Sequence, residues 1–244
     1  MPLERNELET KRFGVVAAHL VDTDAGTEEI DDRAAVLGVE MLTARVHVDA
    51  LRTVHRLEDA GFRLMDTLVV YGRALADPPT APARAAGTSI RVAHDDDAAS
   101  VGAIAADAFT NYVGHFHADP LLDDTDADAA YVEWAESSVA ANSADRPVLV
   151  ACEDEDVLGF LTLQGVGEPT AEIVLNAVDP RHQGRGLYAA LVHGAMTLAT
   201  RAGTDKLVVS TQINNYAVQR VWSRLGFAHE RSVYTLHRWF DRTG

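Results

Sequence analysis

The pattern of apolar and polar positions predicts strands that alternate with helices along the first 75 residues. Short apolar or β-branched runs indicate strands, whereas apolar residues three or four positions apart indicate helices with one buried face. By these rules the stretch contains strands over 13–21, 41–48 and 62–75, and helices over 27–37 and 50–60. Thr27, followed by Glu28 and Glu29, opens the first helix, and Asp49 caps the second. We therefore expect a small α/β domain over residues 1–75.

A stretch rich in proline and alanine follows, residues 76–88, with no apolar period; this composition is typical of a linker. Beyond it the pattern predicts strands over 89–93, 146–152, 157–166, 171–178, 206–211 and 228–239, and helices over 98–109, 125–142, 186–202 and 215–225. Asp95–Asp97 supplies the cap and the acidic first turn of the helix that begins at residue 98. Glu153–Asp156 is expected to be a solvated turn, and we find no internal repeat. The second domain should span residues 89–244.

The strand over 171–178 runs through a glycine loop directly into a helix. Gly184 and Gly186 let the backbone approach a ligand closely, and the unpaired amides at the start of a helix favour an anion. Gln183 and Arg185 add side-chain donors, so a pyrophosphate would fit this loop. A two-glycine loop is also common as a plain turn between a strand and a helix, so the loop alone leaves both interpretations open.

Elements around the loop resemble the GCN5-related N-acetyltransferase (GNAT) family. Gln183–Tyr188 resembles the family's Q/R-x-x-G-x-G/A loop, and Ala177–Pro180 looks like the strand end and turn before it. After the strand over 207–211 come Asn215, Ala217, Trp222 and Leu225-Gly226-Phe227. Together they resemble the family's N-x-x-A-x-x-x-Y-x-x-x-G-F element. The resemblance covers residues 89–240 in element order. It implies the family's α/β fold with a mixed sheet, here preceded by a smaller α/β domain.

In that family acetyl-CoA enters a wedge between two strands, so the resemblance implies coenzyme contacts at defined positions. Backbone groups near Ala177 and Val178 would pair with the pantetheine arm, and one amide would polarise the thioester carbonyl. Amides of the loop would hold the pyrophosphate, and Asn215 would lie near the thiol end. The implied coenzyme-binding residues are Ala177, Val178, Gln183, Gly184, Arg185, Gly186, Leu187, Tyr188, Asn215 and Trp222.

Two residues depart from the family pattern. Tyr188 stands where Gly or Ala is usual, so its ring must point out of the first helical turn or touch the coenzyme. Trp222 stands where many members have a tyrosine that protonates the departing thiolate, and an indole N–H is a poor proton donor. Water, Tyr216 or Tyr234 would then serve this step, and we keep Tyr234 as a catalytic candidate.

The resemblance extends to family members that acetylate the amino group of a nucleotide-linked sugar. The matching segments are Phe13-Gly14, residues 57–62, His115–Pro120, Val209–Gln212 and Tyr234–Arg238. They imply an amino-sugar nucleotide as acceptor, with contacts from His115, His117 and Gln212. Asp66 stands where these enzymes have an acidic residue, and its apolar surroundings would favour a general base; an outward-facing aspartate is the other interpretation. The two histidines are rival bases, and without a third ligand they predict no metal site.

The formal net charge is −16, yet residues 180–244 hold nine Arg and Lys against three Asp and Glu. A basic end favours a polyanionic small ligand, whereas the acidic remainder argues against nucleic acid as a partner. Lysine-poor, acidic chains suit a salt-rich cytoplasm, and a GC-rich genome explains the bias equally well. The lone Cys152 excludes an intrachain disulfide, and no run approaches the roughly 20 apolar residues of a membrane-spanning helix. With no signal-peptide pattern, we expect a cytoplasmic protein.

Three functions stay open. The first is an acetyl-CoA-dependent N-acetyltransferase that acts on an amino-sugar nucleotide. The second keeps the reaction but changes the acceptor to a peptide, a polyamine or an aminoglycoside, because an acidic surface attracts cations. The third, suggested by Trp222, is an acyl-CoA-binding module without catalysis. Edge strands in both predicted domains leave a homodimer open.

Overall fold

The computed structural model describes residues 1–76, 81–83, 86–110 and 112–240, which form two compact units. The first unit contains residues 1–69 and 113–127 and the chain from residue 231 onward; the second contains residues 70–112 and 128–230. These bounds differ from the expected domains because a central loop and the last strand pack with the N-terminal residues. The linker predicted over 76–88 lies partly outside the described residues.

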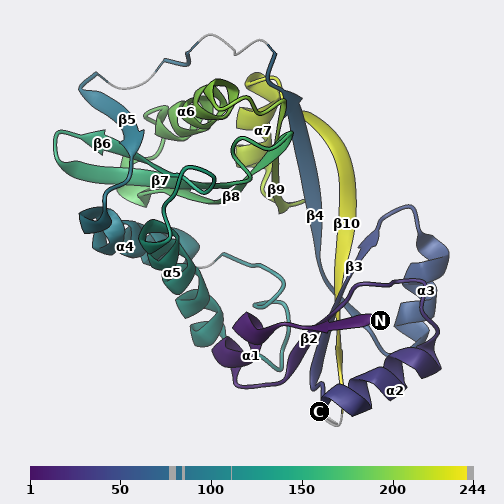
Figure 1. Cartoon of the computed structure of the whole chain (residues 1–244). Helices are drawn as coiled ribbons and strands as arrows, with labels where there is room; N and C mark the ends of the chain where they lie inside the picture. The colour runs from purple at the N-terminus through teal and green to yellow at the C-terminus, as the bar shows by residue number, and fades with distance from the viewer. Residues whose placement is uncertain (77–80, 84–85, 111, 241–244) are drawn as a thin grey trace. The chain divides into compact units, whose positions relative to one another are not determined.

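The first unit is a small mixed sheet with helices between its strands (Figure 1). Its elements are β1 (Leu3–Arg5), α1 (Glu7–Phe13), β2 (Ala17–Leu20), α2 (Thr27–Leu37), β3 (Met41–His47), α3 (Leu51–Asp59) and the first part of β4 (Arg63–Ala74). β2 runs antiparallel to β1 and parallel to β3, and β3 pairs antiparallel with the end of β10 (Ala228–Trp239). The core of this unit gathers apolar residues of α2, α3 and the strands, Ile30, Leu42 and Leu57 among them.

Two local predictions for this unit are wrong. The strand expected over 13–21 begins only at Ala17, because the residues before it form α1. Asn6 starts that helix: its side chain accepts the amide hydrogen of Glu9 at 3.0 Å. Asp49 caps no helix. Its carboxylate instead lies 2.5 Å from Nδ1 of His47, and α3 starts after Ala50 without a side-chain cap.

The second unit has helices on both faces of its sheet. Its elements are the end of β4, then β5 (Thr88–Val92), the short 3-10 turn Asp95–Asp97, α4 (Ala98–Phe109), α5 (Asp124–Ala140, from residue 128), β6 (Val148–Glu153), β7 (Asp156–Gln164), β8 (Thr170–Val178), the 3-10 turn Pro180–His182, α6 (Leu187–Arg201), β9 (Lys206–Gln212) and α7 (Tyr216–Arg224). The strand order is β4-β9-β8-β7-β6-β5. Figure 1 shows α4 and α5 on one face and α6 and α7 on the other. A separate apolar cluster fills the space under each pair of helices.

The two units repeat one order of elements, which the sequence did not reveal as a repeat. In the first unit β2, α2, β3 and α3 follow one another and lead into β4; in the second, β8, α6, β9 and α7 lead into β10. In both, a parallel pair of strands encloses the first helix, and an antiparallel strand flanks that pair. The two units therefore resemble each other in topology.

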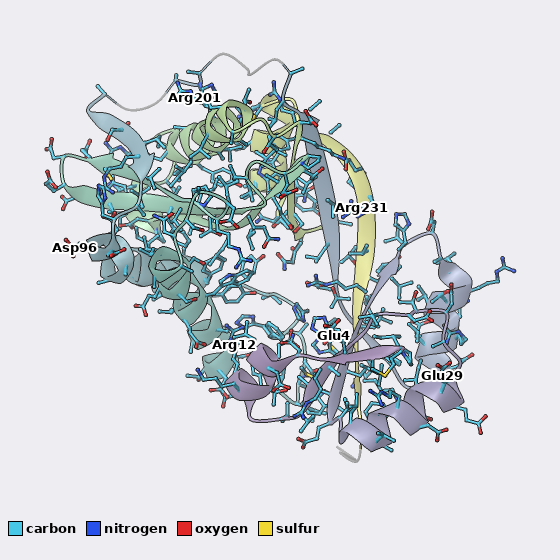
Figure 2. The ribbon with its side chains drawn as sticks, viewed as in Figure 1. Glu4, Arg12, Glu29, Asp96, Arg201 and Arg231 are labelled. Carbon is cyan, nitrogen blue, oxygen red and sulfur yellow. The ribbon has the colours of Figure 1, made fainter. Side chains whose placement is uncertain are left out.

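Charged side chains lie mostly at the surface. Figure 2 shows Glu29 on α2 and Asp96 before α4 directed outward, and both are exposed. Asp97, by contrast, is buried. Its carboxylate accepts hydrogen bonds from the amide of His94 at 2.7 Å and from both terminal guanidinium nitrogens of Arg91. The acidic run therefore forms a 3-10 turn before α4, and the prediction that it supplies a side-chain cap and the first turn of that helix is wrong. Among the residues described, no helix has the length and apolar character that crossing a bilayer requires.

Candidate active site

Strands β8 and β9 are paired over only part of their length. Their parallel ladder ends at the pair Ile173 and Val209. β8 continues through residues 174–178 and β9 through residues 210–212, and within the described chain no ladder pair joins these two stretches. The second unit therefore has, at the carboxyl ends of two parallel strands, the opening that the resemblance implies. Ala177 and Val178 lie on this open stretch, where both are largely buried.

The loop after β8 presents backbone amides at the start of α6. Gly184 and Gly186 both have φ of +77°, in the left-handed region that glycine adopts without strain. Gly186 is the N-cap of α6, and no side chain caps this end of the helix. The helical hydrogen bonds begin with the amide of Ala190, which donates to the carbonyl of Gly186 at 3.0 Å. The amides of residues 187–189 therefore precede the helical ladder and suit an anion.

Arg185 in this loop already has an anionic partner. Its Nη2 lies 2.5 Å from Oε1 of Glu153 at the end of β6, and its Nη1 lies 2.9 Å from Nδ1 of His182. The hydrogen bond from Arg185 lowers the pKa of Glu153. Residues 154–156 are exposed around the expected turn, but Glu153 ends β6 and pairs with the cation that was predicted to meet a phosphate.

Polar side chains gather at the end of β9. The Tyr112 hydroxyl donates to Oε1 of Gln212, which is buried at the last position of the strand. Asn215 is the N-cap residue of α7, but its side chain makes no capping hydrogen bond and instead donates from Nδ2 to the hydroxyl of Thr211 at 3.0 Å. These contacts place Gln212 and Asn215 at the same end of β9 as the opening. Gln212, which was predicted to contact the amine that accepts the acetyl group, thus lies near Asn215, a predicted coenzyme-binding residue.

The two residues that depart from the family pattern, Tyr188 and Trp222, contact each other. Trp222 is fully buried in the cluster beneath α6 and α7, and its Nε1 donates to the hydroxyl oxygen of Tyr188 at 2.8 Å. Tyr188 keeps part of its surface exposed. Trp222 was predicted to contact the coenzyme. Its indole is packed in the core and has no exposed surface with which to make that contact. Tyr188 does not project outward from the helix; its ring reaches toward α7.

The predicted catalytic residues lie in the first unit. Asp66 is a half-buried residue of β4, and Tyr234 is a partly buried residue of β10 that packs against the core of this unit. His117 is partly buried, and its Nδ1 accepts the amide hydrogen of Gly114 at 3.4 Å. The structure therefore assigns these residues and the coenzyme positions to different units, and their catalytic roles stay predictions.

His115 belongs to a buried chain of hydrogen bonds in the first unit. Its Nδ1 lies 2.9 Å from Nε2 of His237, and Nδ1 of His237 lies 2.7 Å from Oδ2 of Asp119. The indole of Trp239 donates to the same carboxylate oxygen at 2.9 Å. Burial, and after it the charge of His237, holds the pKa of His115 well below its usual value. His115 is thus a neutral ring at neutral pH, held by β10.

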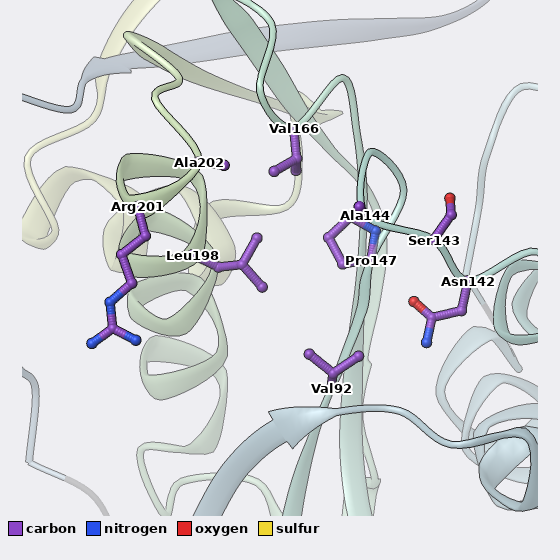
Figure 3. A pocket seen from close by; sticks show the side chains of 9 residues that line it. All are labelled: Val92, Asn142, Ser143, Ala144, Pro147, Val166, Leu198, Arg201 and Ala202. Carbon is purple, nitrogen blue, oxygen red and sulfur yellow. The ribbon is translucent and has the colours of Figure 1, made fainter.

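Neither a metal centre nor the hollow in Figure 3 contributes to this site among the described residues. Within the described ranges, no three His, Cys, Asp or Glu residues are grouped so as to hold a metal ion. Figure 3 shows an open hollow lined mainly by apolar side chains, including Val166, Leu198 and Ala202. It lies at the C-terminal end of α6, whereas the glycine loop precedes the N-terminal end, so this hollow is separate from the candidate site.

Comparison with known proteins decides the family. The model of the acetyltransferase (GNAT) family matches residues 106–227, half of the chain, and includes the opened strands, the glycine loop and α7. The chain belongs to the GNAT acetyltransferase family. The solved structure of a GCN5-related N-acetyltransferase from Sphaerobacter thermophilus superposes with a TM-score of 0.67 at 14% identity, covering 97% of this chain and 76% of that one. The family resemblance and the mixed α/β fold expected from the sequence are confirmed.

Three curated relatives are 26–28% identical to parts of this chain. The spore coat polysaccharide biosynthesis protein SpsD of Bacillus subtilis is 26% identical over 59% of this chain and 48% of its own. The dTDP-fucosamine acetyltransferase of Escherichia coli O6:H1 is 28% identical over 44% and 46%. N-alpha-acetyltransferase 30 of Schizosaccharomyces pombe is 26% identical over 42% and 64%. The chain spans about half the length of two of these relatives and under two thirds of the third.

Sequence reasoning missed the partners of several site residues. Glu153 pairs with a residue 32 positions away, and Tyr112 with one 100 positions away. No local pattern announces such contacts. The Tyr188–Trp222 contact had a signal, because both residues depart from the family pattern within 34 positions of each other.

Proposed function

We propose that this protein is an acetyl-CoA-dependent N-acetyltransferase. The observation that carries the proposal is the opening between β8 and β9, which leads into the uncapped start of α6 within the region that matches the GNAT family. An open strand edge accepts an extended, amide-bearing chain such as pantetheine, and a helix start accepts a diphosphate. When bound, the thioester supplies the activated acetyl group.

The residues of the second unit fit this coenzyme in chemistry. The open stretch of β8 offers the backbone of Ala177 and Val178 to the pantetheine arm, and one of these amides would polarise the thioester carbonyl. Gln183 and the amides after Gly186 would hold the diphosphate. Arg185 would join them on exchanging Glu153 for a phosphate oxygen, because both anions bind the same guanidinium.

The acceptor that we propose is an amino-sugar nucleotide. The support is the set of segments that resemble those of sugar acetyltransferases, together with two relatives, which are a spore coat polysaccharide biosynthesis protein and a dTDP-fucosamine acetyltransferase. His115, His117 and Gln212 are the predicted acceptor contacts. The third relative is named as an N-alpha-acetyltransferase, which favours a peptide amine as the second candidate. A homodimer and a cytoplasmic location stay predictions.

A panel of amines offered with acetyl-CoA separates these functions. Thiol release is measured with nucleotide-linked amino sugars, with short peptides that have a free N-terminus, and with polyamines and aminoglycosides. We expect turnover with the sugars alone. Turnover with peptides or polycations alone would transfer the proposal to those acceptors. Tight binding of acetyl-CoA without turnover on any amine would instead identify an acyl-CoA-binding module.

Acetylation of an ammonium requires removal of a proton, and Asp66 is the predicted base. We expect Asp66→Asn to lower turnover about 100-fold, the lower end of what general base catalysis contributes, with acetyl-CoA affinity unchanged. Asp59→Asn, at an exposed aspartate that ends α3, is the matched control and should behave as the wild type. Stopped thiol-release assays and coenzyme titration measure the two quantities. Equal turnover in wild type and Asp66→Asn would remove Asp66 from the mechanism.

A further inference from the structure

Many family members have a tyrosine hydroxyl where this chain has Trp222, and the structure places another hydroxyl group beside that residue. The sequence has Trp222 in place of a tyrosine, and its indole N–H reaches the hydroxyl oxygen of Tyr188 at 2.8 Å. An indole nitrogen can only donate, so Tyr188 accepts this hydrogen bond and keeps its own hydrogen to donate elsewhere. The phenol of Tyr188 therefore stands next to the position from which the family's tyrosine would act.

Tyr188 also lies next to the glycine loop that follows β8. It is the second residue of α6, directly after the glycine loop, and it is partly exposed. Its hydroxyl oxygen accepts the hydrogen bond from Trp222 of α7. Tyr188 thus connects the start of α6, which would hold the diphosphate, to the helix that follows β9.

The surroundings keep this phenol protonated while easing a transient loss of its proton. Burial raises the pKa of Tyr188, and the hydrogen bond from Trp222 opposes that rise. The phenol consequently keeps its proton throughout the neutral range. The indole N–H stabilises a phenolate because hydrogen bonds to charged groups are stronger than those to neutral ones.

We propose that Tyr188, held by Trp222, gives its hydroxyl proton to the coenzyme sulfur as the acetyl group leaves. This inference rests on the acetyl transfer proposed above. The amine nitrogen forms a bond to the acetyl carbon, the bond from that carbon to sulfur breaks, and the electron pair goes to sulfur. Sulfur takes the proton of Tyr188, and the phenolate recovers one from the newly acetylated nitrogen, either directly or through water.

On this proposal, the two departures from the family pattern amount to moving one tyrosine from residue 222 to residue 188. A tyrosine is lost at residue 222 and gained at residue 188, and the tryptophan that replaces the first holds the hydroxyl of the second. Water, Tyr216 and Tyr234 were the candidates that the sequence left for this proton. Tyr216 is 62% exposed at the start of α7, and Tyr234 is partly buried against the core of the first unit. Neither has the oriented contact that Tyr188 has.

The first test needs no acceptor. The pKa of the thiol in bound coenzyme A is measured by thiolate absorbance over a pH series, with the complex of desulfo-coenzyme A subtracted to cancel the protein's tyrosines. A hydrogen bond to a thiolate is worth ~1.5 kcal/mol, which corresponds to about one pKa unit. We expect the thiol pKa to be about one unit higher in Tyr188→Phe than in the wild type. Tyr71→Phe is the matched control, because Tyr71 also packs on Trp222 and loses the same group; it should leave the thiol pKa unchanged.

The second test uses the amine that the panel identifies. Tyr188→Phe should lower kcat about 100-fold with little change in KM for acetyl-CoA. The exchange variant Tyr188→Ala with Trp222→Tyr, which moves the hydroxyl to the family's position, should recover activity that Tyr188→Ala alone loses. An equal thiol pKa in wild type and Tyr188→Phe would overturn the role of Tyr188 and leave acetyl transfer intact. Failure of the wild type to bind coenzyme A would overturn both proposals.

Discussion

Gly184→Asp is expected to weaken acetyl-CoA binding about 100-fold while leaving the fold intact. The φ of Gly184 is +77°, a conformation that aspartate tolerates better than most residues, and a Cβ placed there meets no atom within 4 Å. The new carboxylate would stand in front of the α6 amides, where the diphosphate is expected. Loss of hydrogen bonds to a charged group costs about 1.5–3 kcal/mol, and each 1.4 kcal/mol is about tenfold in affinity. Isothermal titration with acetyl-CoA measures the change.

The other end of the same helix provides the control. Gly203 follows α6, has φ of +87°, and also has open space at its Cβ. Gly203→Asp therefore introduces the same charge with the same backbone demand, far along the helix from the glycine loop. Its acetyl-CoA affinity should match the wild type. Equal affinities for the two variants would show that the diphosphate does not bind at the start of α6.

Elements whose pattern is local could be predicted from the sequence. The helices over 27–37 and 98–109 and the strand over 228–239 have the bounds that the sequence predicts. Each depends on neighbouring residues alone: an acidic first turn, an apolar period or a β-branched run. The glycine loop was found for the same reason, because a strand, two glycines and a helix follow one another directly.

What the sequence could not predict depends on distant partners. His115 was expected to contact an acceptor, yet its ring meets His237, which lies 122 positions later in the chain. The compact units likewise combine segments that are far apart in sequence, so a linker between residues 76 and 88 could not define them. Periodicity shows that a side chain is buried but does not show which side chain it faces.

Asp119→Ala is expected to lower the free energy of unfolding by about 3–5 kcal/mol, because each buried donor left without its acceptor costs about 1–3 kcal/mol. The Asp119 carboxylate accepts hydrogen bonds from His237 and Trp239 and from the amide of Leu121, and all three donors would lose their acceptor. Burial raises the pKa of Asp119, but the hydrogen bonds together lower it by more than burial raises it, so the net shift is downward. The stabilisation is therefore present above the pKa of an unfolded aspartate and is lost as the pH falls through the lowered value. Urea unfolding at neutral pH measures the change.

Asp49→Ala is the matched control, because it also removes an aspartate from a histidine, at 2.5 Å, but at the surface. Exposed pairs contribute little, so this variant should unfold within ~0.5 kcal/mol of the wild type. The contrast isolates burial as the source of the effect, since both variants remove the same charge. If Asp119→Ala were as stable as Asp49→Ala, the chain from His115 through His237 would not hold the loop over 113–122 to β10.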